Sequence, residues 1–231
     1  MKQKILCIIQ ARTGSTRLPR KVLLKVAKKT ILEHVVARVK KAKKINKIII
    51  ATTDKKEDNI IERLCDKIGI NCFRGSEDDV LDRYYQCSVR YPKYTAILRI
   101  TSDCPFIDPV IIDKVLDLFV KNNFDYACNT QPETFPDGSD VEVFKKDLLK
   151  KAANKARLAP EREHVTQYMR NRKGIKRGNI KAAADFSHMR ITLDTKEDLK
   201  IVHYLIKNSK PDDGYLDHVA LLTKISKYEN I

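Results

Sequence analysis

KILCIIQARTGSTRLPRK, residues 4–21, sets the architecture that the rest of the chain continues. Its first part, Lys4–Ile9, is a continuous apolar run, which is typical of a parallel strand buried on both faces. Its second part, Gln10–Lys21, is polar and begins where that strand ends. Ligands of open α/β sheets bind at the carboxyl ends of the strands. This stretch therefore predicts a buried strand that leads into a ligand-binding loop.

Segments of strand length and segments with helical periodicity alternate up to about residue 122. This alternation predicts an α/β fold with a mostly parallel sheet and helices on both faces. Strands are expected at Lys4–Ile9, Ile48–Thr52, Asn71–Arg74, Ala96–Thr101, Asp125–Asn129, Asp140–Phe144 and Arg190–Leu193. Helices are expected after the capping-box pair Thr30 and Glu33, between a cap at Asp54 and Gly69, over Glu77–Arg90, from Pro109, and over Lys145–Arg157, Arg162–Arg172 and Lys196–Lys207.

The length of 231 residues suits one domain, which we expect to span residues 1–231. The alternation breaks down between about 130 and 190, so we expect an acceptor-binding or dimerisation region there. No stretch approaches the roughly 20 apolar residues of a membrane span. The apolar run near the N-terminus is too short for a secretory signal, so we expect a cytoplasmic protein without a membrane partner.

The chain is strongly basic, with 46 Lys and Arg against 30 Asp and Glu and a net charge of +16. One interpretation is a nucleic-acid-binding protein. The other is a lysine-rich, solvated surface, because 31 of these residues are Lys and 15 are Arg. The densest basic block, Arg20–Lys47, contains no Phe, Tyr or Trp on which bases could stack. We therefore favour the solvated surface, and binding of nucleic acid without catalysis is the less favoured alternative.

The six cysteines do not indicate a metal centre. They form no CxxC pair and have no Cys/His spacing typical of zinc. Most lie within apolar runs, where Cys behaves as a small hydrophobic residue. We expect reduced, structural thiols.

The loop after the first strand has the composition of a phosphate-binding loop. Gly14, Ser15 and Thr16 leave backbone N–H groups accessible, and backbone donors combined with cations can bind a polyphosphate. The sequence is neither a Walker loop nor a GxGxxG motif. The alternative is an exposed turn that happens to be basic. The cations of the loop are Arg12, Arg17, Arg20 and Lys21.

Two acidic residues follow expected strands. Asp103 comes two residues after Ala96–Thr101, and Asp194 comes directly after Arg190–Leu193. Both should therefore lie at the edge of the sheet that carries the basic loop, where they could hold Mg²⁺ together with phosphate oxygens. The alternative is structural: Asp103 caps a turn, and Asp194 caps the last helix with Glu197 at the capping-box position.

QARTGSTRLPRK closely resembles the signature loop of the nucleotide-sugar cytidylyltransferases, a family related to the CMP-KDO synthetases, and the match is nearest to its SpsF-like spore-coat polysaccharide branch. Further blocks that resemble this branch follow in the order of the family and span nearly the whole chain. They are RGSEDDVLDRYYQ (74–86), LRITSDCPFIDP (98–109), DGSDVEVF (137–144), EREHVT (161–166) and RITLDTKEDL (190–199).

The resemblance implies a Rossmann-like nucleotidyltransferase fold, that is, a GT-A-like three-layer sandwich. It implies a Mg²⁺-dependent enzyme that transfers CMP from CTP to a sugar, such as a sugar acid, and releases pyrophosphate for polysaccharide or glycan biosynthesis. It also implies a homodimer. The residues alone leave open a transferase that uses another nucleoside triphosphate, because a phosphate-binding loop does not select the base.

The resemblance also assigns roles to residues. Lys21 and Asp103 would be catalytic, and Asp103 and Asp194 would hold the metal. Two departures from the family are Arg20, where Gly is frequent, and Lys196, where Pro is usual. The nucleotide would contact Gln10, Ala11, Arg12, Gly14, Ser15, Arg17, Lys21, Arg74 and Ser76. The acceptor would contact Glu142, Arg162, Glu163 and His164.

Overall fold

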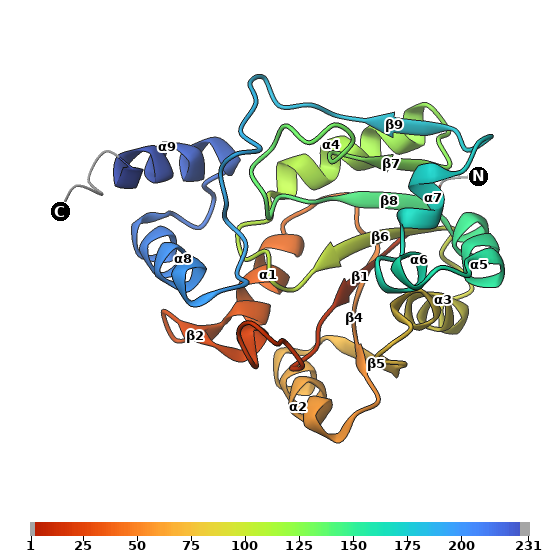
Figure 1. Cartoon of the computed structure of the whole chain (residues 1–231), viewed down its shortest axis with the longest axis horizontal. Helices are drawn as coiled ribbons and strands as arrows, with labels where there is room; N and C mark the ends of the chain where they lie inside the picture. The colour runs from red at the N-terminus through yellow and green to blue at the C-terminus, as the bar shows by residue number, and fades with distance from the viewer. Residues whose placement is uncertain (1–2, 227–231) are drawn as a thin grey trace.

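The centre of the fold is a seven-stranded sheet in the order β5-β4-β1-β6-β8-β7-β9, seen in a computed structural model that describes residues 3–226 (Figure 1). β1, β4, β5 and β6 are parallel, whereas β8 pairs antiparallel with β6 and β7. The prediction of an α/β fold with a mostly parallel sheet is confirmed. The strands are β1 (Ile5–Gln10), β4 (Lys47–Thr53), β5 (Asn71–Gly75), β6 (Ala96–Thr101), β7 (Tyr126–Cys128), β8 (Glu142–Lys145) and β9 (Arg177–Asn179).

Helices cover both faces of the sheet (Figure 1). Successive side chains of a strand point to opposite faces, so Ile5, Cys7 and Ile9 enter one core while Leu6 and Ile8 enter the other. The first core is closed by α1 (Ile31–Val39), α2 (Asn59–Ile68) and α4 (Pro109–Lys121). The second is closed by α3 (Val80–Arg90), α5 (Lys146–Lys155) and α7 (Gln167–Asn171), and α6 (Ala159–Glu163) packs beside α3.

A third apolar cluster supports the carboxyl edge of the sheet. Phe106, Ile191 and Leu193 pack there against α8 (Lys196–Asn208), and α9 (Tyr215–Ser226) packs on α8. This cluster brings the segment before α8 next to the loop that follows β1. The loop itself continues into three short elements, which are η1 (Lys21–Leu23), β2 (Lys25–Val26) and β3 (Lys29–Thr30).

Several local signals act as the sequence predicts. Thr30 and Glu33 form the complete capping box of α1, and Gly69 ends α2 with φ 65°. The cap at Asp54 is wrong: a short 3₁₀ turn, η2 (Lys56–Asp58), comes first and α2 begins at Asn59. Asp58 stands at that junction, and its carboxylate accepts hydrogen bonds from the β1 loop and from β4.

Two predicted elements do not form. The helix over Arg162–Arg172 is wrong, because α6 and α7 are separated at Val165, which has φ 55° and a fully buried side chain. The buried Val165 side chain holds the backbone at a positive φ, which is incompatible with a continuous right-handed helix. The strand over Arg190–Leu193 is also wrong, since only one isolated bridge joins Arg190 to Asp137. The sequence reasoning missed β9, α9 and the β2–β3 hairpin.

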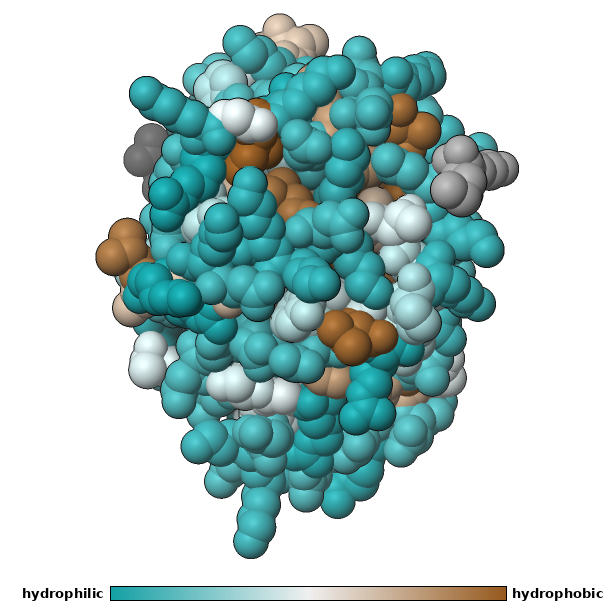
Figure 2. Space-filling view, turned by 90° about the vertical axis from the view of Figure 1, so that its right-hand side faces the viewer, coloured by the Kyte–Doolittle hydropathy of each residue, from teal (hydrophilic) through white to brown (hydrophobic). Residues whose placement is uncertain are grey.

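The surface is largely polar. Figure 2 shows a predominantly hydrophilic face on which apolar residues are scattered. All six cysteines are free and five of them are buried, as expected for structural thiols. Within residues 3–226, no helix combines the length and the hydropathy that a membrane crossing requires.

Candidate active site

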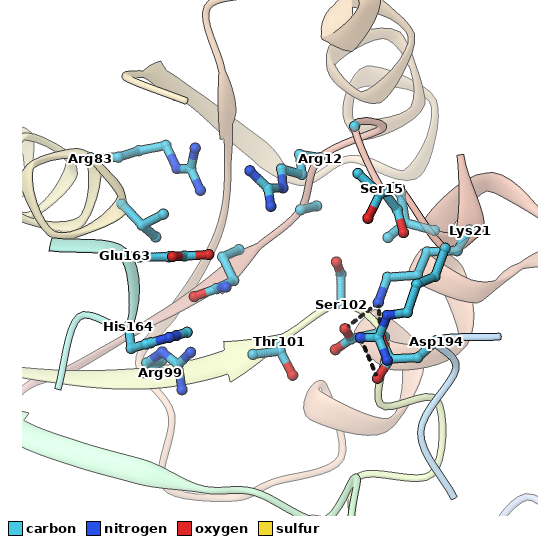
Figure 3. A pocket seen from close by; sticks show the side chains of 18 residues that line it. Arg12, Ser15, Lys21, Arg83, Arg99, Thr101, Ser102, Glu163, His164 and Asp194 are labelled. Carbon is cyan, nitrogen blue, oxygen red and sulfur yellow. Dashed lines mark hydrogen bonds and ion pairs between the residues drawn. The ribbon is translucent and has the colours of Figure 1, made fainter. Parts of the chain in front are cut away.

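A cleft of about 370 Å³ opens at the carboxyl ends of β1 and β6, where the sequence predicts a ligand site (Figure 3). Most of the predicted nucleotide, metal and catalytic residues border it, together with two of the four predicted acceptor residues. Its walls are formed by Gln10, Ala11, Arg12, Gly14, Ser15, Thr16, Arg17, Lys21, Val22, Val80, Arg83, Arg99, Thr101, Ser102, Asp103, Glu163, His164 and Asp194.

The loop after β1 is fixed by a buried carboxylate. The backbone N–H and the hydroxyl of Thr13 donate to Asp58 Oδ1 at 2.8 and 2.6 Å, and the Thr53 hydroxyl donates to Oδ2 at 2.6 Å. Burial alone would raise the pKa of Asp58, but these hydrogen bonds outweigh it and lower the pKa. The loop is therefore held rigidly before any ligand binds. Asp58 carries no sequence signal for this role, because it lies 45 residues from Thr13.

The extra cation of the loop does not belong to the cleft. Arg20 has a left-handed backbone with φ 57°, its N–H donates to Thr13 O at 3.0 Å, and its side chain is exposed. This conformation favours glycine, the residue that the resemblance leads one to expect there. Arg20 therefore closes the loop through its backbone, and its side chain does not line the site.

The outer end of the cleft is an ion cluster around Lys21, visible on the right in Figure 3. Lys21 Nζ lies 2.6 Å from Asp103 Oδ2 and 2.6 Å from Asp194 Oδ1. Burial alone would lower the pKa of Lys21, but the two carboxylates raise it. Burial likewise opposes ionisation of Asp194, yet Lys21, Arg190 and Arg17 lower its pKa. Lys21 and Asp194 are therefore both charged at neutral pH.

Asp194 is not the cap of the last helix. Thr195 and Asp198 form the complete capping box of α8, so the predicted pairing of Asp194 with Glu197 is wrong. The Asp194 carboxylate is left to face the cleft. Arg190 supports it from behind, with one nitrogen 2.7 Å from Asp194 Oδ2 and another 3.0 Å from Asp198 Oδ1.

The inner end of the cleft contains two buried guanidinium groups that the sequence reasoning missed, on the left in Figure 3. Arg83 is 2% exposed and donates to the carbonyl oxygen of Ser76 at 2.8 Å. Arg99 donates to Glu142 at 2.5 Å. Within residues 3–226, the Nε–H group of each arginine is buried without a hydrogen-bond partner. Glu163, the last residue of α6, and His164, which follows it, border this end.

Arg74 and Ser76, predicted to contact the base and ribose, do not line the cleft. The Arg74 guanidinium donates to Thr53 O at 3.0 Å and to Asn59 Oδ1 at 2.5 Å, and it pairs with Glu62 at 3.0 Å. The Ser76 hydroxyl accepts a hydrogen bond from the backbone N–H of Asp79 at 3.0 Å. Ser76 therefore supports the entry to α3, whereas Arg74 joins β5 to the end of β4 and to α2.

Glu142 and Arg162, predicted to contact the acceptor, also lie outside the cleft wall. Glu142 is 0% exposed and pairs with Arg99 and with Arg170 at 2.7 Å. Burial opposes its ionisation, but these two cations hold the pKa of Glu142 at about 2. Arg162 donates to Asp79 Oδ2 at 2.9 Å and so joins α6 to α3. In this structure Glu142 fixes the position of Arg99 at the inner end of the cleft.

Asp140 is a further carboxylate, and the sequence motifs predict no role for it. Arg99 pairs with Glu142 across β6 and β8, and Asp140 lies two residues before Glu142, just outside β8. Its side chain forms no ion pair or hydrogen bond with the residues that the structure describes. Burial, reinforced by the nearby Glu142 carboxylate, raises the pKa of Asp140 to about 7.

The outer carboxylates fit a divalent cation that arrives with phosphate. Asp103 and Asp194 converge on one cation, the Lys21 ammonium, which stands where a metal ion could be held. No cluster of three or more His, Cys, Asp or Glu suited to a metal occurs between residues 3 and 226. Mg²⁺ typically uses one or two protein carboxylates and takes its other ligands from phosphates and water.

A parallel sheet with a cationic loop after β1 and paired carboxylates at the same edge defines the class of α/β nucleotidyltransferases. Within this class the chain belongs to the cytidylyltransferase family. The family model described as Cytidylyltransferase matches residues 6–228. The resemblance expected from the sequence motifs is therefore confirmed.

Individual relatives agree with this assignment. The chain is 36% identical over 230 residues to the spore coat polysaccharide biosynthesis protein SpsF of Bacillus subtilis, covering 95% of this chain and 94% of that protein. It is 44% identical over 208 residues to an uncharacterized protein of Methanocaldococcus jannaschii, covering 89% and 84%. A solved cytidylyltransferase structure from Leptospira borgpetersenii superposes with a TM-score of 0.92 at 33% identity, covering 98% and 96%.

Proposed function

We propose that this cytidylyltransferase transfers CMP from CTP to a sugar acceptor, with release of pyrophosphate, in the biosynthesis of a polysaccharide or glycan. The observation that carries the proposal is the ion cluster of Lys21, Asp103 and Asp194 beside a rigid, cationic loop. The relative SpsF, described as a spore coat polysaccharide biosynthesis protein, supports the biosynthetic direction.

The nucleotide triphosphate would lie along the loop after β1. The Ser15 N–H is already donated to Thr13 O at 2.9 Å, so the donors here are the guanidinium groups of Arg12 and Arg17, which line this part of the cleft. Such donors suit phosphate oxygens, and the anchoring of Thr13 means that no loop ordering has to accompany binding. Gln10 and Ala11 also line this part of the cleft and would contact the nucleotide.

In the reaction, an acceptor oxygen would form a bond to the α-phosphorus of CTP while the bond from that phosphorus to the bridging oxygen of pyrophosphate breaks. The acceptor hydroxyl proton passes to solvent. Negative charge shifts onto the departing pyrophosphate, so catalysis requires positioned cations more than covalent chemistry. Arg12, Arg17 and Lys21 would stabilise that charge. Asp103 and Asp194 would hold Mg²⁺, which when bound lowers the pKa of a coordinated acceptor oxygen and offsets phosphate charge.

The acceptor would enter at the inner end. The two unpaired Nε–H groups of Arg83 and Arg99 favour an anionic acceptor, such as a sugar acid or a sugar phosphate. Glu163 and His164 are exposed at the same end and would contact acceptor hydroxyls. The assignment of Glu142 and Arg162 to direct acceptor contact is not retained, because their side chains are engaged elsewhere.

The proposed function is tested by pyrophosphate release with each of the four nucleoside triphosphates against a panel of sugar acids and sugar phosphates. We expect release with CTP, dependent on both Mg²⁺ and acceptor. Equal release with another nucleoside triphosphate would instead support a transferase of different base specificity. Salt-sensitive binding of DNA or RNA without any turnover would support the nucleic-acid alternative.

We also propose that the enzyme acts as a single-domain cytoplasmic homodimer, as the family resemblance implies. The region between residues 130 and 190, which holds β8 and the short helices α6 and α7, is the candidate dimer arm. Light scattering after size exclusion would give twice the 26.6 kDa mass of the chain for a dimer.

A further inference from the structure

Asp194 is held by different cations on its two oxygens. Oδ1, which faces Asp103, is 2.6 Å from Lys21 Nζ. Oδ2 is 2.7 Å from Arg190 and 3.2 Å from Arg17. The two sides of one carboxylate therefore have separate partners, and the environments of these partners differ.

Arg190 is built into the framework. Its guanidinium contacts Asp137 and Asp198 as well as Asp194, so three carboxylates fix one planar group. Asp198 is itself immobile, because it caps α8 and accepts hydrogen bonds from the backbone N–H groups of Asp194 at 2.8 Å and Thr195 at 2.9 Å. Arg190 thus fixes Oδ2 and leaves Oδ1 directed away from it. The sequence reasoning gave Arg190 no role.

Lys21 has only the ion cluster to hold its ammonium group. Its Nζ donates to Asp103 Oδ2 and Asp194 Oδ1, and these are its only hydrogen bonds from the side chain among the described residues. The side chain is 13% exposed and borders the cleft. A lysine stem is flexible, and its ammonium is a compact point charge that can move between anions.

A divalent cation bound by both carboxylates would occupy the position that the Lys21 ammonium now occupies. One oxygen from each carboxylate lies at contact distance from a single cation there. Two cations cannot share that pair of oxygens, because their mutual repulsion would cancel the attraction. A triphosphate on the loop after β1 would offer Lys21 alternative oxygens and so release the carboxylates.

We propose that Arg190 positions Asp194, and that Lys21 occupies the divalent-cation position in the nucleotide-free protein, so that the cation binds only when nucleotide draws Lys21 away. The proposal rests on the proposed function in taking a nucleoside triphosphate as the ligand of the loop. It concerns the order of binding and adds a positioning residue to the site.

The test is a titration with Mn²⁺ alone, without nucleotide, followed by electron paramagnetic resonance of the free ion. The wild-type protein should show no saturable one-to-one site in the micromolar range. Lys21→Met should create one, and its affinity should exceed that of the wild type by roughly 5- to 150-fold, the range typical of coupling between two ligands. Asp194→Asn in the Lys21→Met background should abolish the new site.

The matched control is Lys25→Met, which removes the same charge from an exposed lysine that forms no salt bridge in the described part of the chain. Equal Mn²⁺ affinity in Lys21→Met and Lys25→Met would overturn the proposal, because general charge would then explain the change. A tight site in the wild type that Asp194→Asn removes would overturn it as well. If Lys21→Met loses its folded circular dichroism spectrum, Lys21→Gln takes its place.

Arg190→Lys tests the positioning role. The substitution keeps the charge but cannot span three carboxylates, so in the Lys21→Met background we expect Mn²⁺ affinity to fall at least about tenfold. Unchanged affinity would remove Arg190 from this role. None of these titrations contains CTP. Failure of the proposed function would appear instead as absent CTP-dependent pyrophosphate release by the wild type.

Discussion

The two ends of the cleft balance their charges in opposite ways. At the outer end, the Lys21 ammonium is paired with Asp103 and Asp194, each at 2.6 Å. Atoms of a bound ligand can take the place of either partner in these pairs. At the inner end, Arg83 is 2% exposed and has no carboxylate partner among residues 3–226. The Lys21 ammonium at the outer end is therefore paired until ligand binds, whereas the inner end keeps a buried cation without a carboxylate partner among the described residues. A bound anion would therefore replace existing ion pairs at the outer end, whereas at the inner end it would supply a partner for a buried cation that has none among the described residues.

The largest effect should come from Glu142, which fixes Arg99 at the inner end. Glu142→Gln would leave Arg99 and the partly exposed Arg170 without their carboxylate, and breaking a buried pair typically costs about 3–5 kcal/mol. We expect a fall in unfolding free energy of this size, measured by urea denaturation. Glu133→Gln, at an exposed carboxyl, is the control. Normal stability with lost acceptor turnover would instead restore Glu142 as an acceptor contact.

The second effect tests the outer end. Asp103→Asn should lower kcat by about 10²–10³-fold, because one group that stabilises transition-state charge is lost. CTP binding, measured by calorimetry, should persist, since the loop cations remain in place. Near-normal turnover in this variant would show that the outer carboxylates act only as partners of Lys21.

The third effect separates the two ends directly. Arg83→Met removes a buried cation that has no ion-pair partner, so we expect unfolding free energy to stay equal or to rise. Substrate affinity should fall roughly 10- to 100-fold, as expected for loss of a charged hydrogen bond. The CTP Kd and the acceptor KM are both measured, with Arg90→Met as control. If neither value changes, the inner end does not bind an anion.

A fourth prediction concerns pH. Burial raises the pKa of Asp140 to about 7 in the folded protein, well above the ordinary aspartate value of 3.8 that applies when the chain is unfolded. The folded state therefore binds more protons between these values, and stability falls as pH rises from about 4 to 7. Asp140→Asn removes this loss, so its gain in unfolding free energy over wild type, measured by urea denaturation, should be larger at pH 8 than at pH 4, on the order of 1 kcal/mol.

Charged groups around Asp140 define the control for this comparison. Glu142, Asp137 and Glu133 raise its pKa and Arg99 lowers it. Asp147→Asn, at an exposed position on α5, is the control variant, and the Asp140→Asn difference is compared with it at both pH values. An Asp140→Asn gain that does not depend on pH would contradict the raised pKa.

The smallest effect concerns the loop at the outer end. Arg20→Gly relieves a left-handed backbone at φ 57° but adds freedom to the unfolded chain, so the net change should stay within about 0.5 kcal/mol. The CTP Kd should change less than about twofold, because the Arg20 side chain does not line the cleft. A large loss of CTP affinity would place Arg20 among the phosphate ligands.

The sequence predicted the outer end far better than the inner end. Lys21 and Asp103 lie in loops that follow strands β1 and β6, so the topology of a parallel sheet brings them to one edge. Asp194 was predicted at this edge from a strand that does not form, and it reaches the edge because its segment packs on α8. Arg83 lies in the middle of α3 and Arg99 in the middle of β6, where nothing local distinguishes them from ordinary helix and strand residues. Their role appears only when α3 packs on the sheet.

Errors in the predicted elements have a similar cause. The break at Val165 depends on burial of one side chain in the core between α3, α5 and α7. The missing strand at Arg190–Leu193 depends on contacts with α8, which bury Ile191 and Leu193 without giving the segment a strand partner. Neither can be read from local periodicity, because a tertiary contact decides between conformations that the local sequence allows.

The sequence by itself determined the α/β class, the start of α1, the phosphate loop and the residues that carry the proposed chemistry. Apolar periodicity, capping and strand-end positions act over a few residues, so they are encoded locally. Only the tertiary structure decided that Asp58 anchors the loop, that Arg190 positions Asp194, and that Lys21 bridges two carboxylates 82 and 173 residues away. Such pairings depend on strand order and packing, which no short stretch of the chain contains.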